Sequence, residues 1–283
     1  MQIRSVAICG VGTMGSGIAQ AIAVCGYTTI LFDINSAVLE KARQSIQKQL
    51  NVMVEKGKIS FEQKEKAFAG IRFTNDINEC RSDLVIEAVA EVMEIKTQLF
   101  RTLTSINSTE TIFASNTSSL SVTSIAGATN MPERFCGLHF FNPAPVMKLV
   151  EVVRTEKTKP EIIEQAVSFI IDIKKTPVVC KDAPGFIVNR VARHFYLESL
   201  KLVEDQSVSM SRLDALMESS GFKMGPFKLM DFIGNDVNLA VTISLYNSFD
   251  QAIRFKPSAL QIEKVEKGEL GKKTGKGYYD YGN

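Results

Sequence analysis

The sequence predicts an α/β protein, with a mostly parallel sheet in its first part and only helices in its second part. Strand and helix patterns alternate through the first two thirds of the chain, as they do in parallel sheets with helices on both faces. From Asp182-Ala183-Pro184-Gly185 the pattern changes, and almost only helical periodicity follows as far as Glu269. The 283 residues, 45% of them hydrophobic, suit one large or two medium domains. We therefore expect one domain over residues 1–183 and another over residues 184–283.

The first predicted unit is a strand, a glycine-rich turn, a helix and a second strand, over residues 6–33. The turn reads Gly10-Val11-Gly12-Thr13-Met14-Gly15 and follows an apolar run. In a dinucleotide site, the first glycine of a G-x-G-x-x-G permits the tight turn and the second lets the backbone approach a pyrophosphate. The third allows close packing of helix on sheet. The helix then begins with unpaired N–H groups that would face the phosphates. This pattern predicts a Rossmann-type cofactor site at Gly10, Gly12, Thr13, Met14 and Gly15.

The second strand of this unit, Ile30-Leu31-Phe32, leads into Asp33. A carboxylate at this place would accept hydrogen bonds from the hydroxyls of the adenosine ribose. A 2′-phosphate would meet like charge there, and Ile34-Asn35 supplies no arginine to neutralise it. The sequence therefore favours NAD over NADP.

The remaining elements of the first domain follow in order. A long polar helix is predicted over residues 37–56, and after a break at Gly57 the Ser60–Gln63 segment has the residues to cap a second helix. Strands follow, and the apolar runs over residues 83–89 and 111–115 predict that these two are buried. The expected strands are 71–74, 83–89, 111–115, 135–140, 149–153 and 176–180, with helices at 93–103 and from Pro160.

In the C-terminal region, apolar residues at helical spacing predict one long helix from Phe186 to Val203. Further amphipathic helices are expected over residues 211–219 and 237–249. So much apolar helical surface often forms a dimer, although a core within one chain is the simpler explanation. The glycine-spaced tail, residues 271–279, is not explained by its pattern.

Polar side chains follow three of the predicted strands, at their carboxyl ends. Glu91 follows the strand over residues 83–89, Asn116 and Ser118 follow the next, and His139 ends the strand that begins at Phe135, with Asn142 just beyond. Ligands of open α/β sheets bind at this edge. We therefore expect the reactive groups among these residues.

An enzyme that oxidises an alcohol with a nicotinamide needs a base for the hydroxyl proton. His139 is suited to this because histidine titrates near neutral pH, and such a base needs an orienting group. Glu151 lies inside the apolar run Leu149–Val153, where a carboxylate is rarely buried without a partner. Pairing the two residues explains both. The alternatives are a packed histidine bound to a backbone carbonyl and an exposed glutamate on an edge strand.

Ser118 and Asn189 have competing interpretations. No G-x-S-x-G elbow surrounds Ser118, so the turn that contains it is interpreted as offering hydrogen bonds rather than a nucleophile. Asn189, one turn into the long C-terminal helix, either projects back toward the sheet ends or makes an ordinary polar contact.

Several classes of protein are disfavoured by composition. A net charge of +2 gives no reason to expect nucleic acid or an anionic membrane as a partner. The five cysteines are scattered and form no disulfide framework, the first strand leaves no room for a targeting peptide, and no apolar run is long enough for a membrane helix. No metal-ligand spacing occurs. We expect a cytoplasmic protein without a metal.

Several segments, taken together, resemble one known family over residues 3–281. They occur in the following order, after the Gly10–Gly15 turn: Asn116–Leu120, His139–Pro143, Met147–Val152, Asp182–Arg190 and Met224–Phe227. The chain resembles the L-3-hydroxyacyl-CoA dehydrogenase family, and the single-function bacterial 3-hydroxybutyryl-CoA dehydrogenases match best in length. The resemblance implies an NAD-dependent oxidoreductase with a Rossmann-type sheet, a helical-hairpin insertion at about 37–69 and an all-α C-terminal domain that dimerises.

The resemblance also implies roles for matching positions. His139 would be the general base in oxidation and the acid in reduction, with Glu151 orienting it, while Ser118 and Asn189 would hold the substrate near C3 and the thioester. Asn142 would lie beside the cofactor or substrate. The remaining residues implied to contact the cofactor are Asp33, Glu91, Lys96, Asn116 and Ser118. Lys48, Lys56 and Lys58 would contact the phosphates of coenzyme A, although a solvated helix face accounts for each equally well.

Two other functions compete with an acyl-CoA dehydrogenase of short-chain, butyryl-type substrates. One is a sugar-acid dehydrogenase on the same scaffold, and the other is a catalytically silent NAD-binding relative. The presence of Ser118, His139, Glu151 and Asn189 together argues against the silent relative. Thr13 and Asn235 depart from common family residues, and the second leaves subunit packing and chain-length preference open.

Overall fold

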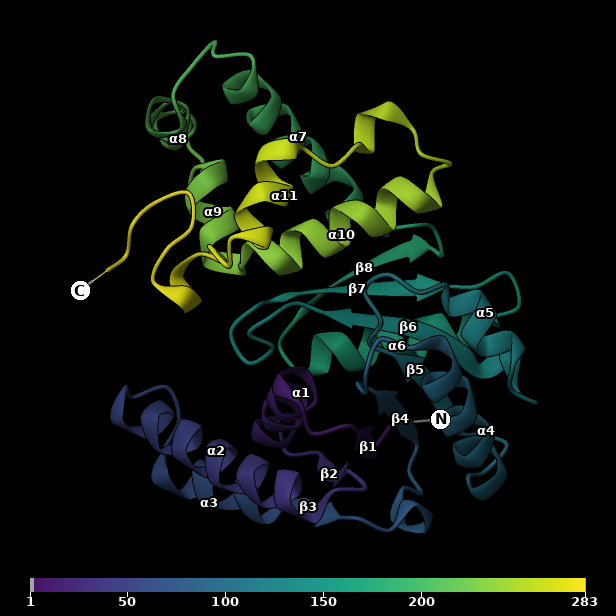
Figure 1. Ribbon diagram of the computed structural model, residues 1–283. Coiled ribbons are helices and arrows are strands. Elements are labelled where there is room, and N and C mark those ends of the chain that lie inside the picture. The colour runs from purple at the N-terminus through teal and green to yellow at the C-terminus, as the bar shows by residue number, and fades with distance from the viewer. Residues whose placement is uncertain (1–2, 283) are drawn as a thin grey trace. The chain divides into compact units, whose positions relative to one another are not determined.

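The computed structural model describes residues 3–282 and divides into two compact units, one ending at Ala183 and one beginning at Pro184. Figure 1 shows the first in purple to teal and the second in green to yellow. Each unit is described by itself below. Within residues 3–282, no helix is long and apolar enough to cross a membrane.

The first unit is built on one eight-stranded sheet with the order β3-β2-β1-β4-β5-β6-β7-β8. The strands are β1 (Ser5–Cys9), β2 (Thr28–Phe32), β3 (Ile71–Thr74), β4 (Leu84–Glu87), β5 (Ile112–Ser115), β6 (Phe135–Phe140), β7 (Leu149–Arg154) and β8 (Thr176–Lys181). All neighbours pair in parallel except β6 and β7, which are antiparallel. The expected mostly parallel sheet is confirmed. The chain first runs outward from β1 to β3 and then returns to β4, so the turn after β1 lies where the strand order reverses. Such a switch point is where open α/β sheets bind their ligands.

Helices cover both faces of this sheet (Figure 1). They are α1 (Thr13–Val24), α2 (Ser36–Glu55), α3 (Phe61–Ala69), α4 (Met93–Ile106), α5 (Val122–Gly127) and α6 (Pro160–Asp172), with short 3₁₀ turns η1 (Ile77–Glu79) and η2 (Pro132–Arg134). On one face, α1, α2 and α6 bury Ile22, Ile46 and Phe169 in a common core. On the other face, Phe100 of α4 packs edge-on against Phe135, with ring centroids 4.6 Å apart.

The expected helical insertion is formed by α2 and α3, which pack on each other (Figure 1). Ser60 caps α3 as the sequence predicts: its hydroxyl accepts the N–H of Gln63, whose side chain accepts the N–H of Ser60. In α2 the buried residues Leu39, Ala42, Ile46 and Leu50 recur every three or four positions. The opposite face of this helix is therefore left to solvent or to a ligand.

Over residues 184–282 the second unit has no strand, only two isolated β-bridges in its tail, and its helices are α7 (Val188–Glu204), α8 (Met210–Ser219), α9 (Pro226–Ile233), α10 (Asn235–Ser248), α11 (Ala259–Glu266), η3 (Ile253–Phe255) and η4 (Lys272–Thr274). The long helix begins two residues later than expected because Phe186 adopts a positive φ of 45°, which a helix does not accommodate. The helices α9 and α11, and α5 in the first unit, were not predicted from the sequence. None of them has more than eight residues, so their apolar periodicity extends over little more than two turns at most.

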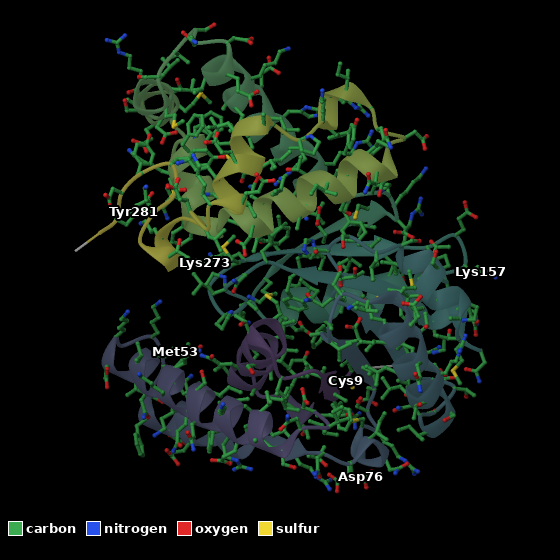
Figure 2. The ribbon with its side chains drawn as sticks, in the orientation of Figure 1. Cys9, Met53, Asp76, Lys157, Lys273 and Tyr281 are labelled. Atoms are coloured by element: carbon green, nitrogen blue, oxygen red, sulfur yellow. The ribbon has the colours of Figure 1, made fainter. Side chains whose placement is uncertain are left out.

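Two buried carboxylates explain the glycine-spaced tail, which Figure 2 marks with Lys273 and Tyr281. Asp231 accepts the N–H groups of Tyr278 and Tyr279 at 2.9 and 3.0 Å and the hydroxyl of Tyr281 at 3.0 Å. A Cβ on Gly277 would collide with this carboxylate. The tail therefore needs a glycine where its backbone passes the buried acid.

The second carboxylate, Asp214, accepts the N–H groups of Phe227 and Lys228, both at 3.0 Å, and the hydroxyl of Tyr279 at 2.7 Å. It thus caps the start of α9 and holds the tail at the same time.

Candidate active site

Two glycines of the turn after β1 are required by the fold itself. Gly10 has a φ of 104° and donates its N–H to the carbonyl of Phe32 at 2.8 Å, and a Cβ there would lie 2.6 Å from the carbonyl oxygen of Ala88. A Cβ on Gly15 would collide with the carbonyl of Gly10. These two residues let α1 pack closely on β1 and β4.

Gly12 differs from both, because the space beside it is open. Its φ of −61° is available to any residue, and no protein atom lies within 4 Å of where its Cβ would be. It is the N-cap of α1, and no side chain caps this helix. A missing Cβ at an uncapped helix N-terminus leaves room for a phosphate to approach the backbone N–H groups. The turn therefore fits a dinucleotide.

Asp33 lies directly beside this turn. Its carboxylate accepts the N–H of Val11 at 3.2 Å and that of Asn35 at 3.0 Å. Its side chain thus braces the turn after β1 from the end of β2. A carboxylate held there and half-exposed suits the hydroxyls of a ribose better than a 2′-phosphate.

A buried lysine joins two glutamates at the end of β4. Lys96 of α4 is 1% exposed, and its ammonium lies 2.5 Å from Glu87 and 3.1 Å from Glu91. Glu87 was not among the residues predicted from the sequence, although it lies in an apolar run as Glu151 does. Since an ammonium has three N–H donors, these two carboxylates leave one for a ligand. The expected contact of Lys96 with the cofactor stays a prediction.

Glu91 fixes the turn that follows β5. It accepts hydrogen bonds from the hydroxyl of Thr117 at 2.6 Å, the N–H of Ser118 at 3.0 Å, and the N–H and hydroxyl of Ser119 at 3.1 and 2.9 Å. Burial raises the pKa of this carboxyl, but the charge of Lys96 and these hydrogen bonds outweigh it, and the pKa is lowered overall. An ionised Glu91 therefore holds Ser118 in place.

Asn116 links the same turn to the end of β6. Its side-chain oxygen accepts the backbone N–H of Phe140 at 2.9 Å, while the backbone N–H of Asn116 donates to the backbone carbonyl of Glu87. Asn116 therefore aligns the ends of β4, β5 and β6. Whether it also contacts the cofactor stays a prediction.

His139 and Glu151 are directly opposite each other on β6 and β7. In an antiparallel pair, such residues project from the same face of the sheet. Leu138 and Phe140, which alternate with His139, belong to the core beneath α6, so the pair faces the other side. Nδ1 of His139 lies 2.7 Å from Oε2 of Glu151, and both side chains are buried.

The other predicted site residues are more scattered. Asn142 is exposed in the loop after β6, and Asn189 is half-buried in the first turn of α7, in the second unit. Lys48, Lys56 and Lys58 are exposed on α2 and the turn after it, the region marked by Met53 in Figure 2. The structure thus brings three groups together: Asp33 with the glycine turn, Glu91 and Lys96 with the Asn116–Ser119 turn, and His139 with Glu151.

Comparisons with known proteins cover both units. Residues 5–183 match the family model of the 3-hydroxyacyl-CoA dehydrogenase NAD binding domain, and residues 185–281 match that of the 3-hydroxyacyl-CoA dehydrogenase C-terminal domain. Over 99% of its length the chain is 45% identical to the 3-hydroxyadipyl-CoA dehydrogenase of Escherichia coli (strain K12), of which it spans 60%.

Two further matches cover nearly all of both chains. Over 99% of this chain and 91% of the relative, it is 39% identical to the mitochondrial hydroxyacyl-coenzyme A dehydrogenase of Sus scrofa. The crystal structure of (S)-3-hydroxybutyryl-CoA dehydrogenase from Ralstonia eutropha is similar with a TM-score of 0.95 at 36% identity, over 100% of both chains.

Proposed function

The chain belongs to the 3-hydroxyacyl-CoA dehydrogenase family and uses NAD, and on this premise we propose that it interconverts (3S)-3-hydroxyacyl-CoA and 3-oxoacyl-CoA esters. NAD supplies the hydride-transfer chemistry when bound at the glycine turn. Gly10, Gly12, Thr13, Met14 and Gly15 would hold its pyrophosphate. Asp33 would hold the adenosine ribose.

The observation that carries this proposal is the buried His139–Glu151 pair. In oxidation, the imidazole accepts the proton of the 3-hydroxyl, and in reduction it returns a proton to the carbonyl oxygen. Glu151 contacts Nδ1, so Nε2 is the ring nitrogen that exchanges the proton. The carboxylate also fixes the tautomer and stabilises the imidazolium, as a buried acid does in hydrolase triads.

The remaining predicted residues are proposed to position the two ligands. Ser118, held by Glu91, and Asn189 hydrogen-bond the substrate near C3 and the thioester. Asn142 lies beside cofactor and substrate. Glu91, Lys96 and Asn116 keep their proposed cofactor contacts, and Lys48, Lys56 and Lys58 are proposed to meet the phosphates of coenzyme A.

We also propose that the second unit forms a homodimer. It exposes several large apolar side chains, namely Val191, Leu216, Phe232, Val237 and Ile253. Scattered apolar residues are common on surfaces, but a domain of this size that leaves so many uncovered favours association with a second copy. Sedimentation of the purified protein at two concentrations tests this directly.

Two acyl groups are candidates for the substrate. The favoured one is the short-chain pair, 3-hydroxybutyryl-CoA and acetoacetyl-CoA. The second is a dicarboxylic chain of the adipyl type, which the name of the Escherichia coli relative suggests and which a buried arginine described below favours.

Initial rates with a series of 3-oxoacyl-CoA esters, with NADH or NADPH, test the proposal. We expect turnover with acetoacetyl-CoA or the six-carbon esters and a clear preference for NADH, since Asp33 disfavours a 2′-phosphate. Reduction of sugar acids but not of acyl-CoA esters would favour the alternative dehydrogenase. Tight NADH binding without turnover on either class would identify a silent relative.

A further inference from the structure

The second unit buries an arginine that the proposed reaction does not use. Arg193 of α7 is 3% exposed. Its Nη1 contacts only neutral groups of α10: the backbone and side-chain oxygens of Asn238, at 2.8 and 3.0 Å, and the hydroxyl of Thr242, at 2.8 Å. Over residues 3–282, no carboxylate lies within ion-pair distance of it. Burial lowers its pKa to about 10, against a small opposing effect of Tyr196.

A buried cation without a counter-charge is costly, and this one also lacks a hydrogen-bond partner for a donor. Nε of Arg193 and Nδ2 of Asn238 are both buried without a partner. The orientation of the Asn238 amide is fixed, because its side-chain oxygen accepts hydrogen bonds from Nη1 of Arg193 and, at 2.7 Å, from Nε2 of Gln261. Two unpaired donors on neighbouring residues, next to a positive charge, favour the binding of an anion.

One unpaired atom of the same network is an acceptor. Oε1 of Gln261 is buried without a partner and would not face a carboxylate. A water molecule bound together with an anion would satisfy such an atom, as buried waters commonly do. The network therefore suits a hydrated carboxylate.

The position of Arg193 on α7 indicates which anion this is. It follows Asn189 by four residues, so the two lie on the same face of the helix, one turn or about 6 Å apart. Asn189 is the residue proposed to hold the substrate near C3 and the thioester. In a six-carbon dicarboxylic chain, the second carboxylate lies three carbons beyond C3, which is within reach of an arginine one helical turn away.

We propose that Arg193, together with Asn238, binds the terminal carboxylate of a dicarboxylic 3-hydroxyacyl chain and makes the enzyme prefer it to a methyl-terminated chain of equal length. This inference rests on the proposed function, because it takes the role of Asn189 from there. The planar guanidinium can bind a carboxylate through two parallel hydrogen bonds, which the point charge of a lysine cannot reproduce.

The test compares 3-oxoadipyl-CoA with 3-oxohexanoyl-CoA, which differ only at the far end of the chain. In the unmodified enzyme we expect kcat/KM with NADH to be at least about tenfold higher for the dicarboxylic ester. Arg193→Met should lower that value about 100-fold while changing the value for 3-oxohexanoyl-CoA less than about threefold. Arg193→Lys should fall between. Arg254→Gln, which removes an exposed arginine of the same unit, is the matched control and should change neither value.

The possible outcomes separate the two proposals. An enzyme with no preference between the two esters, or an Arg193→Met variant that loses activity equally on both, would overturn the carboxylate site and leave Arg193 as a brace between α7 and α10. Should both Arg193 variants fail to fold, binding of the dead-end ligands adipyl-CoA and hexanoyl-CoA to the unmodified enzyme decides, since at least about tenfold tighter binding of adipyl-CoA is expected and equal binding refutes the site. An enzyme inactive on every acyl-CoA ester refutes the proposed function itself.

Discussion

The two units of the molecule differ in the groups that contact their buried acidic side chains. In the first unit, Glu151 contacts His139 and Glu87 contacts Lys96, so each acid has a partner that carries or exchanges a proton. In the second unit, Asp214 and Asp231 are buried as deeply, but their hydrogen bonds come from backbone N–H groups, tyrosine hydroxyls and one amide. A carboxylate opposite an imidazole can support proton transfer, whereas one opposite N–H groups holds the chain in place. Burial of an acid alone therefore does not identify an active site; its partner does.

The largest expected effect is that of His139→Gln. A glutamine amide can still donate to Glu151, so the fold and NADH binding should persist, but the variant has no group that titrates. We expect kcat to fall between about 10²- and 10⁴-fold, the range typical of acid–base catalysis. Steady-state rates and an NADH fluorescence titration check this. Turnover within about tenfold of the unmodified enzyme would remove His139 as the base.

Asp231→Asn should give the reverse result, a loss of stability with little loss of rate. The NH2 group of asparagine would replace one of the two carboxylate oxygens and face the N–H of either Tyr278 or Tyr279, so that buried N–H donors are left unpaired. We expect the free energy of unfolding to fall by about 2–3 kcal/mol, measured by urea denaturation. Asp250→Asn, at an exposed position, is the control and should change it by less than about 0.5 kcal/mol. Equal stability of the Asp231 and control variants would contradict a purely structural role.

Features that depend on neighbouring residues could be predicted from the sequence. Features that depend on residues far apart in the chain could not. Strand periodicity and the glycine turn are local patterns, so the strands and the turn after β1 were predictable from neighbouring residues. The pairing of His139 with Glu151 was predicted from chemistry. Their register, however, depends on the loop over residues 141–148 and on β7 running antiparallel, which no local pattern specifies.

Glu87 and Arg193 show why the remainder was missed. Glu87 has the same signal as Glu151, a carboxylate in an apolar run, but its partner Lys96 comes from a helix whose polar residues look like an ordinary solvated face. Arg193 interrupts the apolar stripe of α7, so the sequence pattern predicts an exposed side chain at this position. Its burial depends on Asn238 and Thr242, which are far away in sequence and become neighbours only when α7 and α10 pack.

Gly12→Ala tests whether a ligand or the fold requires this glycine. Its expected effect is smaller than those of the two variants above. Because the added methyl group meets no neighbouring element and the φ angle suits alanine, stability should fall by less than about 1 kcal/mol, the cost of alanine at an N-cap. The methyl group would instead occupy the space of the pyrophosphate, and we expect the Kd for NADH to rise about tenfold, or 1.4 kcal/mol. Thermal melting and fluorescence titration measure both quantities. Gly15→Ala, whose methyl group collides with Gly10, should lose stability, and a similar loss in Gly12→Ala would show that the fold rather than the ligand requires that glycine.

The smallest expected effect concerns the pH dependence of stability at Glu91. Because its pKa is lowered in the folded protein, the ionised form is stabilised by folding. That contribution is complete above the ordinary pKa of a glutamate and is lost as the pH falls through the lowered value. Glu91→Gln should therefore reduce stability by about 1 kcal/mol at pH 7, and this difference from the unmodified protein should shrink below about pH 4. A difference that stays constant from pH 7 to pH 3 would mean that Glu91 holds the Ser118 turn by its shape alone, without a contribution from its charge.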